Sequence, residues 1–321
     1  MKKFGALLVL LLAAQVPLFA QVGVMVQLNR RNYMLHEHVY ACVTLRNNTG
    51  KPMMFGERPE LQGFVLFDIR DRENRPVPGI KGQEISVTGL YLAPGEVKRM
   101  IIPLTRYYNL SRSGKYTVYA YVSHNMLKKE YRSKDLLFYV SEGVEVWKRH
   151  VGVPDLNGKN VPGERIYTIL SLNEGGLRSY YLQVEDEKSL LAVTRIGHQI
   201  SYEKFQAEVD MLSRIHLLMP VGPRVFHYMA FNVNGMNLAN SYWKTSGTIP
   251  MLYRDPKNGE VSRIGGVPAR KGIDYRDPRE GRASVADILE DTPPQTPAAR
   301  PDEGVIDLGE KVMPMKAADE K

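Results

Sequence analysis

The sequence predicts an all-β fold with two β-sandwich-type domains in tandem and a disordered C-terminal tail. Three observations lead to this prediction. Short apolar stretches alternate with polar residues between turn signals, which is typical of half-buried strands. Tyrosine is abundant, with 18 among 321 residues, and aromatic residues favour strands. Only one cysteine is present, so no internal disulfide can form and each domain must be stabilised by burial.

The first twenty residues follow the three-part plan of a secretory signal peptide. Met1-Lys2-Lys3 is basic, residues 6–12 are apolar, and Leu18-Phe19-Ala20 offers a small residue before a cleavage site. The apolar run is marginal for the ~20 residues that a membrane-spanning helix needs, and no later segment approaches that length. We therefore expect residues 1–20 to be a signal peptide of a bacterial protein that is periplasmic or secreted and has no membrane span.

Residues 21–142 are expected to form the first domain. Asn47-Asn48-Thr49-Gly50 and Pro94-Gly95 predict turns between strands. About seven short strands with turns at this spacing indicate a sandwich and not a parallel sheet. The predicted strands include Val22–Leu28, Val39–Leu45, Phe64–Ile69, Val97–Leu104, Tyr116–Val122 and Leu136–Val140.

Three motifs of this domain resemble bacterial immunoglobulin-like and macroglobulin-like β-sandwich domains. Tyr33-x-x-x-Glu37-x-Val39, which leads into Val43–Gly50, resembles their second strand, and Leu92–Glu96 resembles the turn before a later strand. Leu110-x-x-x-Gly114-x-Tyr116-x-Val118 resembles the tyrosine corner, in which a tyrosine hydroxyl binds the backbone of the corner. The sequence departs from the pattern at His36, where glycine is common. The resemblance implies an immunoglobulin-like first domain and no particular function.

Residues 143–275 are expected to form a second β-rich domain. Phe205, Val209 and Leu212 lie near helical spacing, so residues 202–212 could form a short helix. Elsewhere the alternation predicts strands and a hairpin. The predicted strands are Arg165–Leu172, Tyr180–Glu185, Leu190–Ile196, Ile215–Met219 and Arg224–Val233.

Residues 276–321 are rich in proline and charge and nearly free of aromatic residues, which predicts a disordered tail. Ala283–Leu289 and Val305–Leu308 are apolar islands that are either docking motifs or residual hydrophobicity. Residues 271–321 carry 8 Lys/Arg and 12 Asp/Glu, whereas residues 21–270 carry 33 and 23. A basic body favours anionic envelope polymers as partners, or serves solubility alone. No clustered basic footprint is present, so no nucleic-acid partner is expected.

Histidines give the candidates for a metal site. If Val221-Gly222 is a two-residue hairpin turn, His216 and His227 face each other across two strands, where both rings could reach one ion. The alternative is that they are ordinary cross-strand neighbours, and since two ligands are not a site we expect no metal and no cofactor. Possible third ligands are Asp210, Glu208 and His198. On a strand, His36, His38 and Cys42 would share one face but lack a fourth ligand.

No catalytic motif is present: the sequence has no Gly-x-Ser-x-Gly elbow and no phosphate-binding loop, and Ser213, Asp210 and His216 have no spacing that supports a triad. We expect a non-catalytic interaction or scaffold protein of the bacterial envelope, whose partner is a protein or an anionic envelope polymer. The alternative is a carbohydrate- or cell-wall-binding module, and a metal-dependent enzyme is less favoured. A sugar-binding module requires a coplanar pair of exposed aromatic rings, and the candidates are Trp147, Trp243, Tyr107 and Tyr108.

Overall fold

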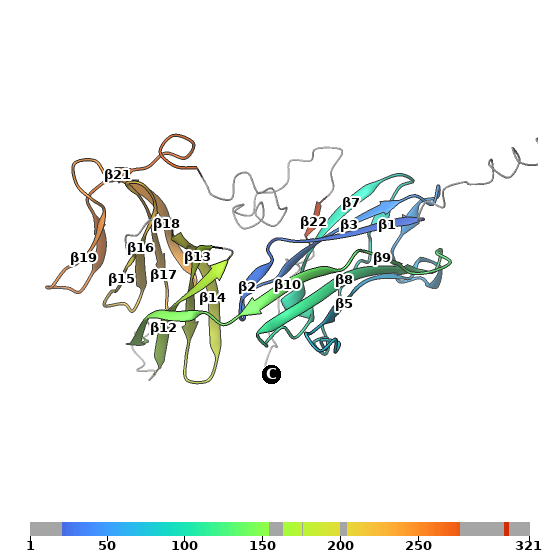
Figure 1. The fold of residues 1–321 in the computed structure, drawn as a ribbon, viewed down its shortest axis with the longest axis horizontal. Coiled ribbons are helices and arrows are strands. Elements are labelled where there is room, and N and C mark those ends of the chain that lie inside the picture. Colours follow the sequence, from blue (N-terminus) through green and yellow to red (C-terminus); the bar gives the residue numbers. More distant parts are fainter. Residues whose placement is uncertain (1–20, 154–162, 175, 200–203, 277–304, 308–321) are drawn as a thin grey trace, which may run out of the picture.

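The computed structural model describes residues 21–153, 163–174, 176–199, 204–276 and 305–307. These residues form an all-β protein with two groups of sheets, one on each side of the short connection at Glu142-Gly143 (Figure 1). We call the groups the N-terminal domain, which holds β1 to β10, and the C-terminal domain, which holds β11 to β21. The proposed leader at residues 1–20 and most of the proposed tail lie outside the described residues.

The N-terminal domain consists of two main sheets packed face to face. Two very short strands form a separate pair beside them, and two single-turn helices lie in the connections. One sheet has the order β1 (Val22–Leu28), β3 (Tyr40–Asn47), β7 (Val97–Pro103) and β22 (Val305–Asp307). The other has the order β2 (Asn32–Met34), β10 (Leu136–Ser141), β8 (Gly114–His124) and β5 (Gly63–Arg70), with β9 (Tyr131–Arg132) beside β8. The remaining elements are β4 (Met53–Met54), β6 (Tyr91–Leu92), η1 (Pro59–Leu61) and α2 (Leu104–Tyr107).

The C-terminal domain also contains two main sheets, and a hairpin extends from it. The first sheet has the order β11 (Val144–Gly152), β12 (Glu164–Glu174), β13 (Leu177–Glu185) and β14 (Leu190–Gln199). The second has the order β15 (Gln206–Val209), β16 (Ile215–Gly222), β17 (Val225–Phe231), β18 (Asn237–Lys244) and β21 (Val267–Pro268). The hairpin consists of β19 (Met251–Arg254) and β20 (Val261–Ile264).

Alternation of side chains builds a separate core in each domain. In β8, Tyr116, Val118, Ala120 and Val122 are buried, while the residues between them are half-buried. They pack against inward residues of the facing sheet, such as Val43 and Ile102. The core of the C-terminal domain joins β12 and β13 to β16 and β17 in the same way, and Tyr167 and Leu182 lie at its centre.

The structure confirms the predicted strands and corrects one predicted element. Residues 202–212 were expected to form a short helix, but Gln206–Val209 is β15, which pairs antiparallel with β16. The apolar spacing was misleading because Phe205 lies just before β15 and Val209 is its last residue, and both side chains pack against the core from this edge strand. The tyrosine corner is present, since the Tyr116 hydroxyl donates to the carbonyl oxygen of Arg112 at 2.7 Å.

Of the two apolar islands in the predicted tail, Val305–Leu308 overlaps β22, and Ala283–Leu289 lies outside the described residues. Strand β22 pairs parallel with β7 at the edge of the first sheet (Figure 1). No helix in the described part of the chain is long and apolar enough to cross a lipid bilayer.

Candidate functional site: the tyrosine face

The outer face of the sheet β5-β8-β10 carries a group of aromatic and apolar side chains. Because strand side chains alternate, the positions between the core residues of these strands all point to this face. Phe64, Leu137 and Tyr139 are 45%, 39% and 40% exposed. We call this surface the tyrosine face, and its members are Phe64, Leu66, Tyr119, Tyr121, Leu137 and Tyr139.

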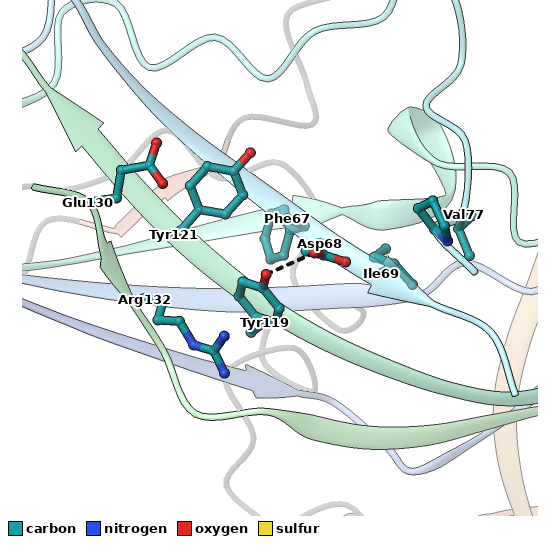
Figure 2. Close-up of a pocket in the computed structure, with 9 residues that line it drawn as sticks. Phe67, Asp68, Ile69, Val77, Tyr119, Tyr121, Glu130 and Arg132 are labelled. Carbon is teal, nitrogen blue, oxygen red and sulfur yellow. Dashed lines mark hydrogen bonds between the residues drawn. The ribbon is translucent and has the colours of Figure 1, made fainter. Parts of the chain in front are cut away.

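A pocket of about 490 Å³ opens on the tyrosine face where β5, β8 and β9 meet (Figure 2). In Figure 2 the rings of Tyr119 and Tyr121 lie side by side along β8, between the carboxylate of Asp68 and the side chain of Glu130. Register places them there, because Tyr119 is the partner of Asp68 and Tyr121 is the partner of both Leu66 and Arg132. The remaining lining residues are Phe67, Ile69, Pro76 and Val77.

One carboxylate of the pocket is fully engaged. Arg70 donates to both oxygens of Asp68, at 3.0 and 2.9 Å, and the Tyr119 hydroxyl donates to Oδ2 at 2.8 Å. The hydrogen bonds from Arg70 hold the pKa of Asp68 below its ordinary value, so this carboxylate is ionised. The hydrogen bond to Asp68 in turn raises the pKa of Tyr119. Asp68 therefore orients Tyr119 and has little capacity left for a ligand.

Other polar groups of the pocket remain available. Within the described residues, neither the Glu130 carboxylate nor the Tyr121 hydroxyl makes a hydrogen bond or an ion pair. Burial raises the pKa of Tyr121, so its hydroxyl stays protonated and can donate. Arg132 lies 4.2 Å above the ring of Tyr119 and forms an ion pair with Asp135 at 2.8 Å. The pocket thus presents an acceptor, a hydroxyl and a cation beside two aromatic rings, which is a set suited to binding.

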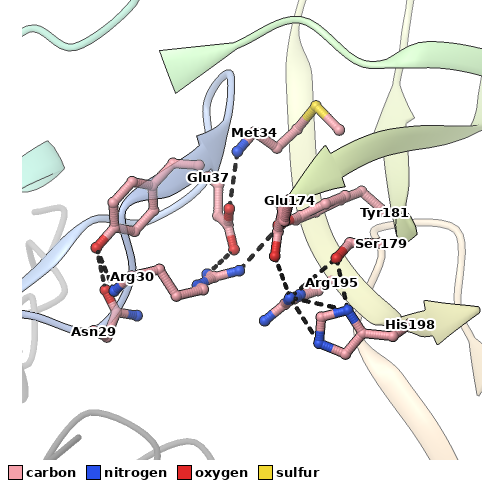
Figure 3. Close-up of polar contacts among 10 residues, drawn as sticks. Asn29, Arg30, Met34, Glu37, Glu174, Ser179, Tyr181, Arg195 and His198 are labelled. Carbon is pink, nitrogen blue, oxygen red and sulfur yellow. Dashed lines mark hydrogen bonds and ion pairs between the residues drawn. The ribbon is translucent and has the colours of Figure 1, made fainter. Parts of the chain in front are cut away.

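A second polar cluster joins the two domains (Figure 3). It is a chain of contacts that we call the junction network. The guanidinium of Arg30 contacts the Glu37 carboxylate and donates to the Tyr181 hydroxyl at 3.1 Å. Tyr181 then donates to Glu174 Oε1 at 2.6 Å, and Arg195 pairs with Glu174 Oε2 at 2.6 Å. These residues lie up to 165 positions apart in the chain, on the turn around β2 and on β12, β13 and β14.

The junction network is buried and nearly saturated. The Glu37 side chain is only 7% exposed, and its second oxygen accepts the backbone N–H of Met34 at 3.0 Å. Burial raises the pKa of the Glu37 carboxyl, and contact with Arg30 opposes that shift. Burial alone would lower the pKa of Arg30, but Glu37 and Tyr181 raise it above its ordinary value and keep the guanidinium charged. An apolar patch formed by Met34, Leu172 and Tyr181 lies against the network.

The structure does not bring His216 and His227 together. His216 is the partner of Ala230 and His227 is the partner of Met219, so the two rings point to opposite faces of the sheet. The expected register is wrong because β16 continues to Gly222 with a bulge, and the turn residues are Pro223 and Arg224. His216 binds Tyr228 at 2.8 Å, and His227 binds Asn240 at 2.5 Å.

The three possible third ligands have other positions. Asp210 Oδ2 lies 3.2 Å from His216 Nε2 and 2.6 Å from Arg214 Nε, so this pair is a buried hydrogen-bonded contact. Glu208 forms an ion pair with Arg149, and His198 binds Ser179 in an extension of the junction network. Ser213 donates to the carbonyl oxygen of Gly152 at 2.6 Å and makes no hydrogen bond with His216. No three His, Cys, Asp or Glu residues in the described ranges gather as metal ligands.

The other sequence candidates are also engaged. His36 lies in a turn with φ of 68°, His38 contacts Thr105 at 3.2 Å, and Cys42 is buried. Among the proposed sugar-stacking residues, Tyr107 is buried and the Tyr108 hydroxyl binds the backbone of Phe67. Trp147 packs against the C-terminal core, and Arg263 lies 3.2 Å from the ring centre of Trp243.

Sequence reasoning missed both the tyrosine face and the junction network. The first left a signal, because apolar residues occupy both faces of the predicted strand Phe64–Ile69 and Tyr119 and Tyr121 occupy the second face of Tyr116–Val122. A strand with one face in water should show polar residues there. The second left no signal, since its partners are brought together only by the tertiary fold.

Comparison with known proteins leaves the family open. No protein-family model matches the chain, and no curated protein matches it. Among solved structures, Spo0M, a sporulation control protein from Bacillus subtilis, is similar at 10% sequence identity and a TM-score of 0.25. The match covers 56% of this chain and 91% of that one. This likeness assigns neither a family nor an activity.

Proposed function

We propose that the protein is an exported, non-catalytic interaction protein of the bacterial envelope, and that the tyrosine face is its docking surface for a protein partner. The observation that carries the proposal is the exposure of Phe64, Leu137 and Tyr139 on one sheet face. Large apolar side chains exposed together on one face of a folded protein are typical of a site of association, and tyrosine is enriched at interfaces because it is both apolar and hydrogen-bonding.

Two further features support a scaffold role. The junction network links the two domains through the hydrogen bond from Arg30 to Tyr181, so the tyrosine face is carried by a sandwich that contacts its neighbour. The tyrosine corner at Tyr116 fits an immunoglobulin-like first domain, a fold that often serves as a scaffold for binding surfaces. Export follows from the signal-peptide pattern of residues 1–20, and processing should leave Gln21 as the mature N-terminus.

The test is site-specific photocrosslinking in intact cells. A photoreactive phenylalanine replaces Tyr121 or Tyr139 on the tyrosine face, or Met25, which is 48% exposed on a strand of the opposite sheet. We expect a discrete crosslinked protein from the first two positions and none from Met25. Tyr139→Ala should weaken the crosslink formed from position 121. Equal crosslinking at all three positions, or none at any, would overturn the docking surface.

A carbohydrate- or cell-wall-binding module is the second candidate, and the open pocket favours it. Glu130 and Tyr121 provide polar groups that have no partner among the described residues, beside aromatic rings, which suits sugar hydroxyls. The rings of Tyr119 and Tyr121 are inclined by 48°, so they do not form the coplanar platform that sugar stacking requires. Titration with soluble cell-wall fragments, using Glu130→Gln and the matched exposed variant Glu145→Gln, separates the candidates. If the pocket binds a glycan, Glu130→Gln lowers the affinity for the fragments and Glu145→Gln leaves it unchanged.

A further inference from the structure

Strand β7 lies at the edge of the first sheet, and a distant segment of the chain occupies that edge. On one side β7 pairs with β3, which is its neighbour in the sandwich. On the other side it pairs parallel with β22, with Val305 opposite Arg99, Ile306 opposite Met100 and Asp307 opposite Ile101. Figure 1 shows β22 beside β7 in the N-terminal domain, although β21, the strand that precedes it in the sequence, belongs to the C-terminal domain.

An open edge strand presents a row of unpaired backbone N–H and C=O groups to any extended peptide. Strand β7 is long enough to act as such a template, because β3 pairs with it along all seven of its residues. Pairing of an extended segment with a sheet edge is a common mode of peptide recognition, in which main-chain hydrogen bonds supply much of the affinity. The edge of β7 therefore has the geometry of a strand-acceptor site.

Burial on the outer side of this sheet supports the assignment. Met100 and Ile102 belong to the core, so Ile101 faces away from it. Cys42, the partner of Ile101 on β3, faces outward in the same way. Both side chains are nevertheless buried, at 1% and 6% exposure, and neither belongs to a core cluster. Around Ile101, β7 is therefore apolar and buried on both faces at the position where β22 pairs with it.

Charge also favours this occupant. Residues 271–321 have an excess of acidic residues, whereas residues 21–270 have an excess of basic ones. The acceptor strand contributes Arg99, which is exposed and lies opposite Val305, and the sequence around β22 includes Asp302, Glu303 and Asp307. Attraction between the acidic tail and the basic body raises the rate at which the two meet.

We propose that the edge of β7 is a strand-acceptor site and that Val305–Asp307 of the same chain is its resident occupant. Three paired residues provide few hydrogen bonds, so the segment stays in place through the high effective concentration that the covalent connection gives it. The tail then closes an edge that would otherwise pair with other chains. A free peptide of the same sequence competes for the edge only when the tethered segment is released.

The first test is a disulfide trap in the full-length protein. In a Cys42→Ser background, Arg99→Cys with Val305→Cys joins two opposed positions, and Lys98→Cys with Val305→Cys is the matched control, since Lys98 faces the other side. We expect an intramolecular disulfide in most molecules of the first pair and at least fivefold less in the control. Equal yields, or disulfides that form only between molecules, would refute the assignment of the occupant.

The second test measures the acceptor site itself. Alternate residues of a strand donate to the same neighbour, so one of two consecutive positions of the tail donates its backbone N–H to β7. Because proline has no backbone N–H, the full-length variant Val305→Pro/Ile306→Pro loses this hydrogen bond whichever position donates. A fluorescent peptide of residues 301–310 should bind this variant at least tenfold more tightly than wild type. The control Ala317→Pro/Ala318→Pro should resemble wild type. Equal affinity in all three proteins, or no binding to any, would overturn the proposal.

Discussion

The junction network and the tyrosine face consist of the same kinds of residue, namely tyrosine, arginine and carboxylate, but they differ in how completely these groups are paired. At the junction, Arg30, Tyr181 and Glu174 form one continuous chain of contacts away from water. On the tyrosine face, Asp68 is paired but Glu130 and the Tyr121 hydroxyl have no partner among the described residues. Residue type therefore does not decide the role: the saturated cluster stabilises the fold, and the open one is available to a ligand.

The largest expected effect comes from Arg30→Met. Removing one member of a buried ion pair leaves the other charge uncompensated, so the free energy of unfolding should fall by about 3–5 kcal/mol. The matched change on the tyrosine face is Arg132→Met, whose ion pair is exposed and should contribute about 1 kcal/mol or less. Guanidinium-induced unfolding at neutral pH measures both. Similar losses in the two variants would erase the distinction between the clusters.

The loss caused by Arg30→Met should shrink in acid. Burial raises the pKa of Glu37, and in the variant Arg30 no longer opposes that shift. The folded-state pKa then lies above the unfolded value of about 4.3, so stability is recovered below the unfolded pKa and lost as pH rises through the folded one. Unfolding curves of variant and wild type across this range provide the measurement. A constant difference at every pH would contradict this account of Glu37.

Tyr181→Phe should have an intermediate effect. It removes one hydrogen-bond partner from Arg30 and one from Glu174 in a buried site, although their ion pairs with Glu37 and Arg195 remain, and this costs about 1–3 kcal/mol. Tyr119→Phe removes an equivalent hydroxyl from the exposed face, where water replaces it, and the change should stay within about 0.5 kcal/mol. Thermal and denaturant unfolding should rank the two variants in this order. The reverse order would mean that the open cluster also carries the fold.

A gain of stability is expected from His36→Gly. His36 holds a left-handed φ of 68° in the turn that presents Glu37 to the junction, and a side chain there costs about 1 kcal/mol relative to glycine. The matched control is Asn74→Gly beside the tyrosine pocket, with φ of 61°. Asparagine tolerates this conformation, so the control should gain less. Unfolding midpoints measure both changes in stability. A loss of stability in His36→Gly would show that the His36 ring makes stabilising contacts in the folded protein.

The smallest effect is expected from Asp68→Asn. The hydrogen bonds from Arg70 lower the pKa of Asp68, so its contribution is present above the unfolded pKa of about 3.9 and is lost as pH falls through the folded one. The contribution should be below about 1 kcal/mol because the site is open to water. The stability difference from wild type should therefore disappear in acid because the wild type loses stability there, whereas the difference for Arg30→Met shrinks because the variant regains it. A difference that persisted would indicate a packing defect.

Local features of the sequence predicted local features of the structure. The spacing of Gly114 and Tyr116 predicted the tyrosine corner, because donor and acceptor lie four residues apart. Asn47–Gly50 predicted a turn, and the Asn47 side chain accepts from Thr49 within it. The departure at His36 identified a position where the backbone does adopt a left-handed conformation. In each case the interacting groups are close in sequence, so the pattern itself contains the geometry.

Features that depend on register or on distant partners escaped the sequence. The His216–His227 pairing failed because Arg224 takes a φ of 63°, and nothing about an arginine signals the position of a turn. Strand β18 was missed because Asn237–Lys244 is too polar to show alternation, although it pairs along β17. The contact between Arg30 and Tyr181 spans 151 positions and depends on how two finished domains meet.

Gly143 has a consequence for how the two domains are connected. A side chain at this position would come within 2.6 Å of Met34 and 2.8 Å of Leu170, so the connection between the domains passes through a space with no slack. A residue larger than glycine here would have to displace side chains of both domains, so this tight connection helps to set how the two sandwiches meet.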